Sequence, residues 1–346
     1  MPATDAPPRP RTAVLLGLLV LGNLAAWGWA LALFAGQPAL LGTALLAWIF
    51  GLRHAVDADH IAAIDNVVRK LVQEGRPAQL VGLWFSLGHS TVVVLASLAV
   101  VAATSAAQGG LPMVAEVGGV IGPLVSGLFL LGIGLYNLVL LLRLLRGMQD
   151  RRSAPAATEA QGVPAHGLLA RVFRPLFGGI RRGWHMYPLG LLFGLGFDTA
   201  SAVGLLGISA AQAAQGLSPW QAPAQVMVFP VLFTAGMALV DTADSVLMTR
   251  AYAWAFVEPA RKLRYNLAIT AISVFVALGV GGAEVLGLIG EHLDLRGPLW
   301  EALEALDAPL GYAGFGITGL LALCFAVSLL LHRGRRDARL GAAGQG

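Results

Sequence analysis

The sequence predicts an all-α polytopic membrane protein with about eight transmembrane helices. Of its 346 residues, 57% are hydrophobic and only 12% are charged, and the mean hydropathy is +0.73. A helix needs about 20 apolar residues to cross a hydrocarbon core of about 30 Å. Apolar runs of this length occupy residues 14–34, 42–64, 80–103, 117–142, 186–210, 225–248, 265–288 and 309–331.

The basic residues predict the orientation of these helices, because Lys and Arg favour cytoplasmic loops. All but two of the 23 Lys and Arg residues precede the first run, follow the last, or connect runs two and three, four and five, or six and seven. The exceptions are Arg53, inside the second run, and Arg296, after the seventh. We therefore expect a multi-pass protein of the inner (cytoplasmic) membrane with both termini in the cytoplasm.

We expect one transmembrane domain over residues 1–346, with a cytoplasmic N-terminus at 1–13, a cytoplasmic loop at 147–183 and a cytoplasmic tail at 333–346. The single cysteine, Cys324, excludes a disulfide framework and a Cys-based metal site. The sequence has no GxxxxGK[ST] phosphate loop, so we expect no ATPase of its own, and no ATPase subunit is evident. The basic pI of 9.6 follows from the topology and does not indicate a nucleic-acid partner.

The second run contains an unusual group of ionisable residues: Arg53, His54, Asp57, Asp59 and His60. A charged group at bilayer depth costs about 2.5 to 3.5 kcal/mol, so such a group indicates a site. In an unbroken helix, His54, Asp57 and His60 share one face with Asp57 in the centre, whereas Asp59 points away by roughly 100°. Asp59 is then better placed to orient an imidazole or a neighbouring helix.

Three further runs carry polar insertions at a similar depth. The third has His89, Ser90 and Thr91, the fifth has Asp198 and Thr199, and the sixth has Asp241, Thr242 and Asp244. The five aspartates of these runs and the second outnumber Arg53 by four formal charges, which predicts a bound cation. Imidazole and carboxylate without thiolate suit Ni, Co, Zn, Mn or Fe(II). We assign the metal to His54, Asp57, Asp59 and His60, and supporting roles to Arg53 and to the polar residues of the other three runs.

Structural alternatives stay open for several of these residues. Arg53 and Asp57 are four residues apart and could simply neutralise each other. Thr91, Thr199 and Thr242 could bond their own helix backbones, and His89 could be an interhelical hydrogen-bond partner.

The sequence also predicts an inverted repeat, in which the second and third runs pair with the fifth and sixth. The prediction rests on short echoes such as Phe85-Ser86-Leu87-Gly88 and Phe193-Gly194-Leu195-Gly196.

Together the four polar segments resemble the signature motifs of the nickel/cobalt transporter family. The RHA(V/F)DADHI motif is intact at residues 53–61 and FSLGHSTVV at residues 85–93. The LGxDTATE motif ends here in Ser201-Ala202, and GMxxxDTxDG has Ser245 in place of its last glycine. The resemblance implies a high-affinity nickel permease that takes up Ni²⁺ or Co²⁺ without another cofactor, with His54, Asp59 and His60 handling the metal.

Two other function classes compete with uptake. The same ligands could serve a nickel or cobalt exporter, although the predicted cytoplasmic loop has only one histidine, His166, with His185 just after it, and no His-rich tract. An intramembrane zinc protease would need His-Glu-x-x-His, whereas the histidines here are six residues apart with no Glu between them. A haem protein would leave the aspartates without a role. We therefore expect a transporter and not an enzyme.

Overall fold

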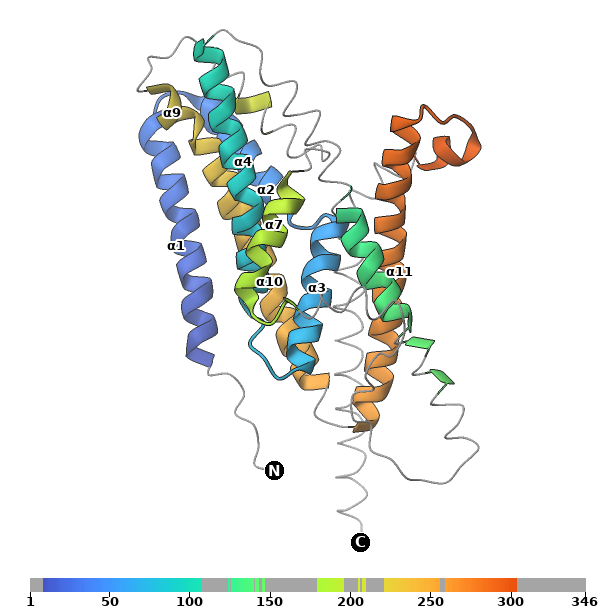
Figure 1. Cartoon of the computed structure of the whole chain (residues 1–346). Helices are drawn as coiled ribbons and strands as arrows, with labels where there is room; N and C mark the ends of the chain where they lie inside the picture. The colour runs from blue at the N-terminus through green and yellow to red at the C-terminus, as the bar shows by residue number, and fades with distance from the viewer. Residues whose placement is uncertain are drawn as a thin grey trace.

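The computed structural model describes residues 9–106, 126–139, 179–195, 221–255 and 259–303, together with positions 124, 141–142, 145–146, 205 and 207–209. All regular elements in these ranges are helical, which confirms the all-α class (Figure 1). Its helices are α1 (Arg9–Phe34), α2 (Pro38–His54), α3 (Ala58–Gln73), α4 (Val81–Ala106), the 3-10 turn η1 (Gly183–His185), α7 (Met186–Gly194), α9 (Gln221–Val226), α10 (Val228–Ala255) and α11 (Pro259–His292). A further short helix covers Ser126–Val139.

Four described helices are long and apolar enough to cross a membrane, and they correspond to the predicted runs 14–34, 80–103, 225–248 and 265–288. The described parts of runs 117–142 and 186–210 are also helical. Several predicted segments lie outside the described residues: residues 1–8, run 309–331, the tail at 333–346 and most of the loop at 147–183. The total of eight spans, the loop and the inverted repeat therefore stay predictions.

The predicted continuous helix over 42–64 is wrong, because the chain breaks between α2 and α3. The two helices are bent by 50° relative to each other. Asp57 has the extended φ and ψ angles (−65°, 147°) of a residue that precedes a helix, and α3 begins at Ala58. Asp is among the residues preferred at this N-cap position. Its carboxylate does not cap α3, however, since it bonds to His54 instead.

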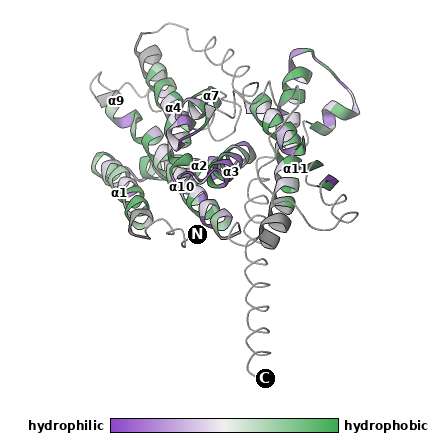
Figure 2. Cartoon of the chain, turned by 60° about the horizontal axis from the view of Figure 1, so that its bottom comes forward, coloured by the Kyte–Doolittle hydropathy of each residue, from purple (hydrophilic) through white to green (hydrophobic). Residues whose placement is uncertain are grey.

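The polar helix α3 lies inside the bundle. Figures 1 and 2 place α1 and α11 at opposite edges with α3 between them, and Figure 2 shows hydrophilic residues gathered on α3. From Ala58 to Arg69, all α3 residues except Asp59 are buried. By contrast, only 17% of the apolar window of α1 is buried, and leucines such as Leu18 and Leu21 face outward. The apolar surface thus faces the lipid, and the polar residues are shielded by neighbouring helices.

Close helix crossings position α2 and α4 against their partners. Gly51 of α2 lies so near the backbone of Phe233 in α10 that a Cβ atom would overlap the Phe233 carbonyl group. Gly88 of α4 lies against the Tyr187 carbonyl of α7 in the same way. Small residues allow such backbone contact between membrane helices. Because Gly51 and Gly88 adjoin His54 and His89, these crossings also fix the positions of the two imidazoles.

Candidate metal site

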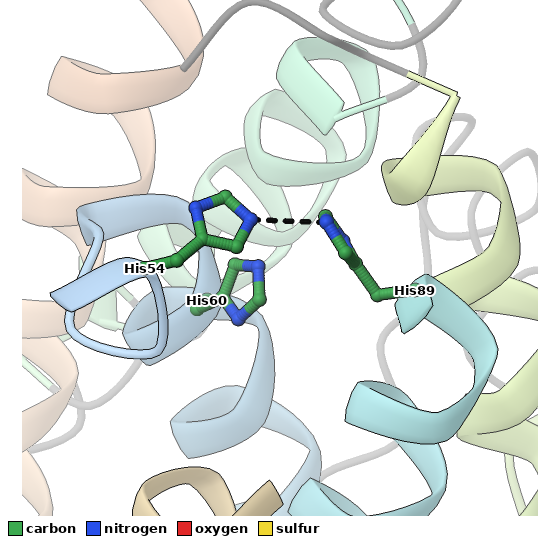
Figure 3. Close-up of side chains that lie close together, drawn as sticks. All are labelled: His54, His60 and His89. Carbon is green, nitrogen blue, oxygen red and sulfur yellow. Dashed lines mark hydrogen bonds between the residues drawn. The ribbon is translucent and has the colours of Figure 1, made fainter. Parts of the chain in front are cut away.

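Three histidines from three helices meet in the interior. His54 is the last residue of α2, His60 lies in the first turn of α3, and His89 lies in α4 (Figure 3). Each offers one ring nitrogen, and these nitrogens all lie within 4.8 Å of one another. The three side chains are almost fully buried, with 1%, 0% and 3% exposure. The break between α2 and α3 contributes directly, because it brings the rings of His54 and His60 to a centroid distance of 4.6 Å.

His54 is oriented by Asp57. The Asp57 Oδ2 atom lies 2.8 Å from His54 Nδ1, so a neutral His54 donates its Nδ1 proton to the carboxylate and keeps the lone pair on Nε2. That Nε2 lies 3.0 Å from His89 Nε2. Metal–imidazole bonds are about 2.0 to 2.1 Å long in zinc sites, so two nitrogens at this separation can reach one ion. A carboxylate on the far nitrogen is a common arrangement for metal-binding histidines.

His60 has a carboxylate partner of its own on α10. Asp241 Oδ2 lies 3.4 Å from His60 Nδ1, and both side chains are completely buried. Among the described residues, His60 Nε2 and His89 Nδ1 have no hydrogen-bond partner. Unsatisfied buried polar atoms cost free energy and call for an explanation such as an unseen ion. The unpartnered Nε2 of His60, in a cluster of imidazoles, fits a site that binds a cation.

Aromatic side chains enclose the cluster on two sides. Phe85 of α4 meets the His60 ring edge-on at a centroid distance of 4.8 Å, and Phe233 of α10 lies 5.6 Å from His54. Phe85 and Phe233 belong to two separate hydrophobic clusters, one around α3, α4 and α7 and the other around α1, α2 and α10. The imidazoles therefore lie where these clusters meet. Apolar walls of this kind exclude water and strengthen electrostatic interactions at the site.

The structure places the other predicted residues of the second run around this cluster. Asp57 is buried beside His54, and the unbroken helix from which its central position was predicted does not exist. Arg53 also contacts Asp57, at 3.8 Å, a longer contact than that of His54. Asp59 is partly exposed and is not grouped with the three histidines.

The polar residues predicted from the other runs separate into three groups. Thr91 donates to the Leu87 carbonyl at 2.8 Å, as the structural alternative expected, and also contacts the Tyr187 hydroxyl. Ser90, Thr242 and Asp244 are buried, and their side-chain oxygens have no hydrogen-bond partner among the described residues. Asp198 and Thr199 lie outside the described residues.

Comparisons with known proteins identify the family of this chain. The model of a family described as "High-affinity nickel-transport protein" (NicO) matches residues 40–331. The chain belongs to this family. It is 53% identical to the hydrogenase nickel incorporation protein HupN of Bradyrhizobium diazoefficiens, over 93% of this chain and 84% of HupN. It is 52% identical to a high-affinity nickel transport protein of Cupriavidus necator, over 95% and 93% of the two chains.

A third relative is the high-affinity nickel-transport protein NixA of Helicobacter pylori, which is 43% identical over 91% of this chain and 95% of its own length. No solved structure matches the chain. Membership of the family, together with the apolar helices, makes this a multi-pass membrane protein.

Sequence reasoning missed a second polar network in this family member, further along α3 than His60. Asp65 accepts hydrogen bonds from Tyr252 and Ser273, and Arg69 donates to Thr270 and Asn66. All these side chains are buried. Asp65, Asn66 and Arg69 lie four to eight residues after the end of the motif. Polar residues so close to the motif were a signal that could have identified them.

The contact between Asp57 and His54 predicts a large effect of Asp57→Asn. The amide keeps the size of the side chain, but it weakens the hold on the Nδ1 proton and removes a charge near the bound cation. Loss of such an outer partner costs about 10-fold to 100-fold in metal affinity. Titration of Ni²⁺ into purified protein measures this loss. Asp294→Asn, at a side chain 81% exposed, is the matched control and should bind normally. Equal affinity in the two variants would contradict the role of Asp57.

Proposed function

We propose that this protein takes up Ni²⁺, and Co²⁺ as a related substrate, across the cytoplasmic membrane through the site formed by His54, His60 and His89. The observation that carries the proposal is the buried meeting of three imidazoles from α2, α3 and α4, two of them with carboxylate partners. Two of the relatives described above are named for nickel transport, which supports nickel as the substrate.

The chemistry of the donors supports a late first-row divalent ion. Imidazole suits Ni, Co, Zn and Cu, and in a given nitrogen and oxygen site Ni²⁺ binds more tightly than Co²⁺. Mg²⁺ and Ca²⁺ prefer oxygen ligands alone. Asp57 and Asp241 add negative charge behind His54 and His60. We expect the site to bind Ni²⁺ more tightly than Co²⁺, and to bind both ions much more tightly than Mg²⁺ or Ca²⁺.

The predicted orientation, together with the membrane potential, supports inward transport. With both termini inside, the end of α3 that carries Arg69 and Lys70 faces the cytoplasm. A divalent cation moving inward gains about 4.6 kcal/mol per 100 mV of membrane potential. The three imidazoles are buried in the structure, which supports an occluded state in the alternating-access cycle that we propose. Asp59 then lies on the entry side of His60 and would meet the incoming ion.

Radioactive nickel accumulation tests the proposal. Cells that express the protein should accumulate more nickel than cells with an empty vector at nanomolar metal, and cobalt should compete better than magnesium. Accumulation below the level of the empty cells would instead identify an exporter. Accumulation equal to that of empty cells, with the protein verified in the membrane, would contradict transport in either direction. It would favour the alternative of an intramembrane enzyme.

Uptake should fall as the pH is lowered from 7 to 5. The ligand must be neutral imidazole, whose ordinary pKa is about 6.5, so protons compete increasingly with the metal over this interval. A loss of at least about 10-fold in apparent affinity is expected when several imidazoles must lose protons. Initial rates in cells clamped at one membrane potential check this. Apparent affinity that does not change between pH 7 and pH 5 would contradict imidazole ligands.

A further inference from the structure

We propose that Ser245 is a positioning residue for the metal site, because its hydroxyl joins the start of α4 to α10 and so sets where His89 lies relative to the other two imidazoles. The inference rests on the proposed function, since it assumes that the three imidazoles bind the ion. Three observations support it: a buried hydrogen bond between α4 and α10, a contact of the two backbones at the same point, and the links that tie the other two histidines to α10.

The hydrogen bond connects Ser245 of α10 to the first turn of α4. The backbone N–H of Gly82 donates to the Ser245 hydroxyl oxygen at 2.7 Å. Gly82 is the second residue of α4, and the first four N–H groups of a helix have no partner within that helix. Ser245 therefore supplies a partner from another helix. Both residues are buried, so the loss of the hydroxyl would leave an unsatisfied N–H group in the interior.

The backbones of α4 and α10 also meet at Gly82. A Cβ atom on Gly82 would overlap the carbonyl group of Asp241, which lies one turn before Ser245 in α10. Small residues allow backbones of membrane helices to approach this closely. Gly82 thus lies against the Asp241 carbonyl and bonds to the Ser245 hydroxyl. Together these two contacts fix the start of α4 on one turn of α10.

The other two histidines are tied to the same helix, α10. The carboxylate of Asp241, from the turn that contacts α4, lies 3.4 Å from His60 Nδ1. His54 ends α2, whose Gly51 packs against the backbone of Phe233 in α10. Helix α10 is therefore a common support for two of the three imidazoles, and the third depends on how α4 is placed against it.

His89 takes its position from α4. It follows Gly82 by seven residues, so at 100° per residue the two lie within about 20° of each other on one face of the helix. Close contacts at Gly88 and Gly190 pack α4 on α7, so a shift at the start of α4 would move His89 with it. His89 Nε2 lies 3.0 Å from His54 Nε2. Groups that act together in a site must be held to within about 0.5 Å, which makes the bond at Gly82 important for metal binding.

The hydroxyl of Ser245 is a departure from the GMxxxDTxDG motif, which has glycine at this position. Glycine has no side chain that could accept a hydrogen bond. Thr249, one turn further along α10, is a matched control, because it is also buried and its hydroxyl donates to the Ser245 carbonyl of its own helix at 2.6 Å. Removing that hydroxyl leaves the bond between Ser245 and α4 in place.

Titration of Ni²⁺ into the full chain in lipid nanodiscs tests the proposal. Ser245→Ala should weaken Ni²⁺ binding by about 10-fold, as the loss of an outer partner of a metal site does. Thr249→Val should bind Ni²⁺ with wild-type affinity. If Ser245→Ala does not fold, Ser245→Gly, which introduces the residue of the motif, takes its place. Wild-type affinity in the Ser245 variant would overturn the positioning role.

A double-mutant cycle with His89 separates positioning from a general effect on the fold. In the His89→Ala background, Ser245→Ala should change Ni²⁺ affinity by less than about 2-fold, because α4 no longer carries a ligand. A loss of about 10-fold in both backgrounds would show that Ser245 only supports the fold and would overturn the proposal. Failure of the wild-type protein to bind nickel would instead contradict the proposed function itself.

Discussion

His54→Ala is expected to abolish nickel uptake and to weaken Ni²⁺ binding by more than about 100-fold. Changes in the outer partners of a metal site cost about 10-fold to 100-fold, and loss of a direct ligand should cost more. His54 is also the residue that links the cluster, since its two nitrogens contact Asp57 and His89. Calorimetric titration of Ni²⁺ into purified protein and uptake in cells at matched expression measure the two effects.

The matched control for this variant is His292→Ala, at the exposed C-terminal end of α11. It removes an imidazole without touching the cluster and should bind and transport nickel normally. If His54→Ala retained wild-type affinity, the cluster could not be the binding site. If both variants lost binding, the effect would come from a general disturbance of the protein.

Gly51→Ala is expected to reduce the amount of folded protein severely. An added Cβ atom would overlap the Phe233 carbonyl group, and a backbone atom cannot move aside as a flexible side chain can. Overpacking of an interior costs about 1 to 3 kcal/mol, and more where backbones must separate. The displacement would also move His54, which lies one turn further along α2. The melting temperature in detergent and the membrane level of the protein measure the loss.

Gly42→Ala offers a control on the same helix. A Cβ atom at Gly42 would meet nothing within 4 Å. Alanine is favoured over glycine in a helix by about 1 kcal/mol, so this variant should be neutral or slightly more stable. Equal melting temperatures for Gly51→Ala and Gly42→Ala would show that the tight contact between α2 and α10 does not hold the site in place.

The sequence predicted the membrane class better than it predicted the geometry of the candidate site. Apolar runs long enough to cross a bilayer can be recognised from composition alone. Clustered charges inside such runs indicate a site, because burying charges in lipid is costly. The break after α2 was harder to see, since residues 53–61 contain neither Pro nor Gly. Only Asp57, as an N-cap residue, signals it locally. The continuous helix assumed in the helical-wheel prediction for Asp57 was therefore wrong.

The role of His89 could not be deduced from the sequence, because it depends on which helices are neighbours. As a lone histidine in an apolar run it was predicted only to support the site, whereas the structure brings its Nε2 within 3.0 Å of His54 Nε2. Asp65 presents the same difficulty, since its partners Tyr252 and Ser273 are far away in sequence. Contacts between distant helices are set by packing that no local pattern contains.

The most direct test of the three-histidine site is X-ray absorption spectroscopy of the protein in nanodiscs with one equivalent of Ni²⁺. In the wild-type protein, the imidazole scattering should correspond to three ligands, from His54, His60 and His89. In His89→Ala it should correspond to two. A spectrum that fits oxygen ligands alone, or one that does not change in His89→Ala, would contradict the assignment.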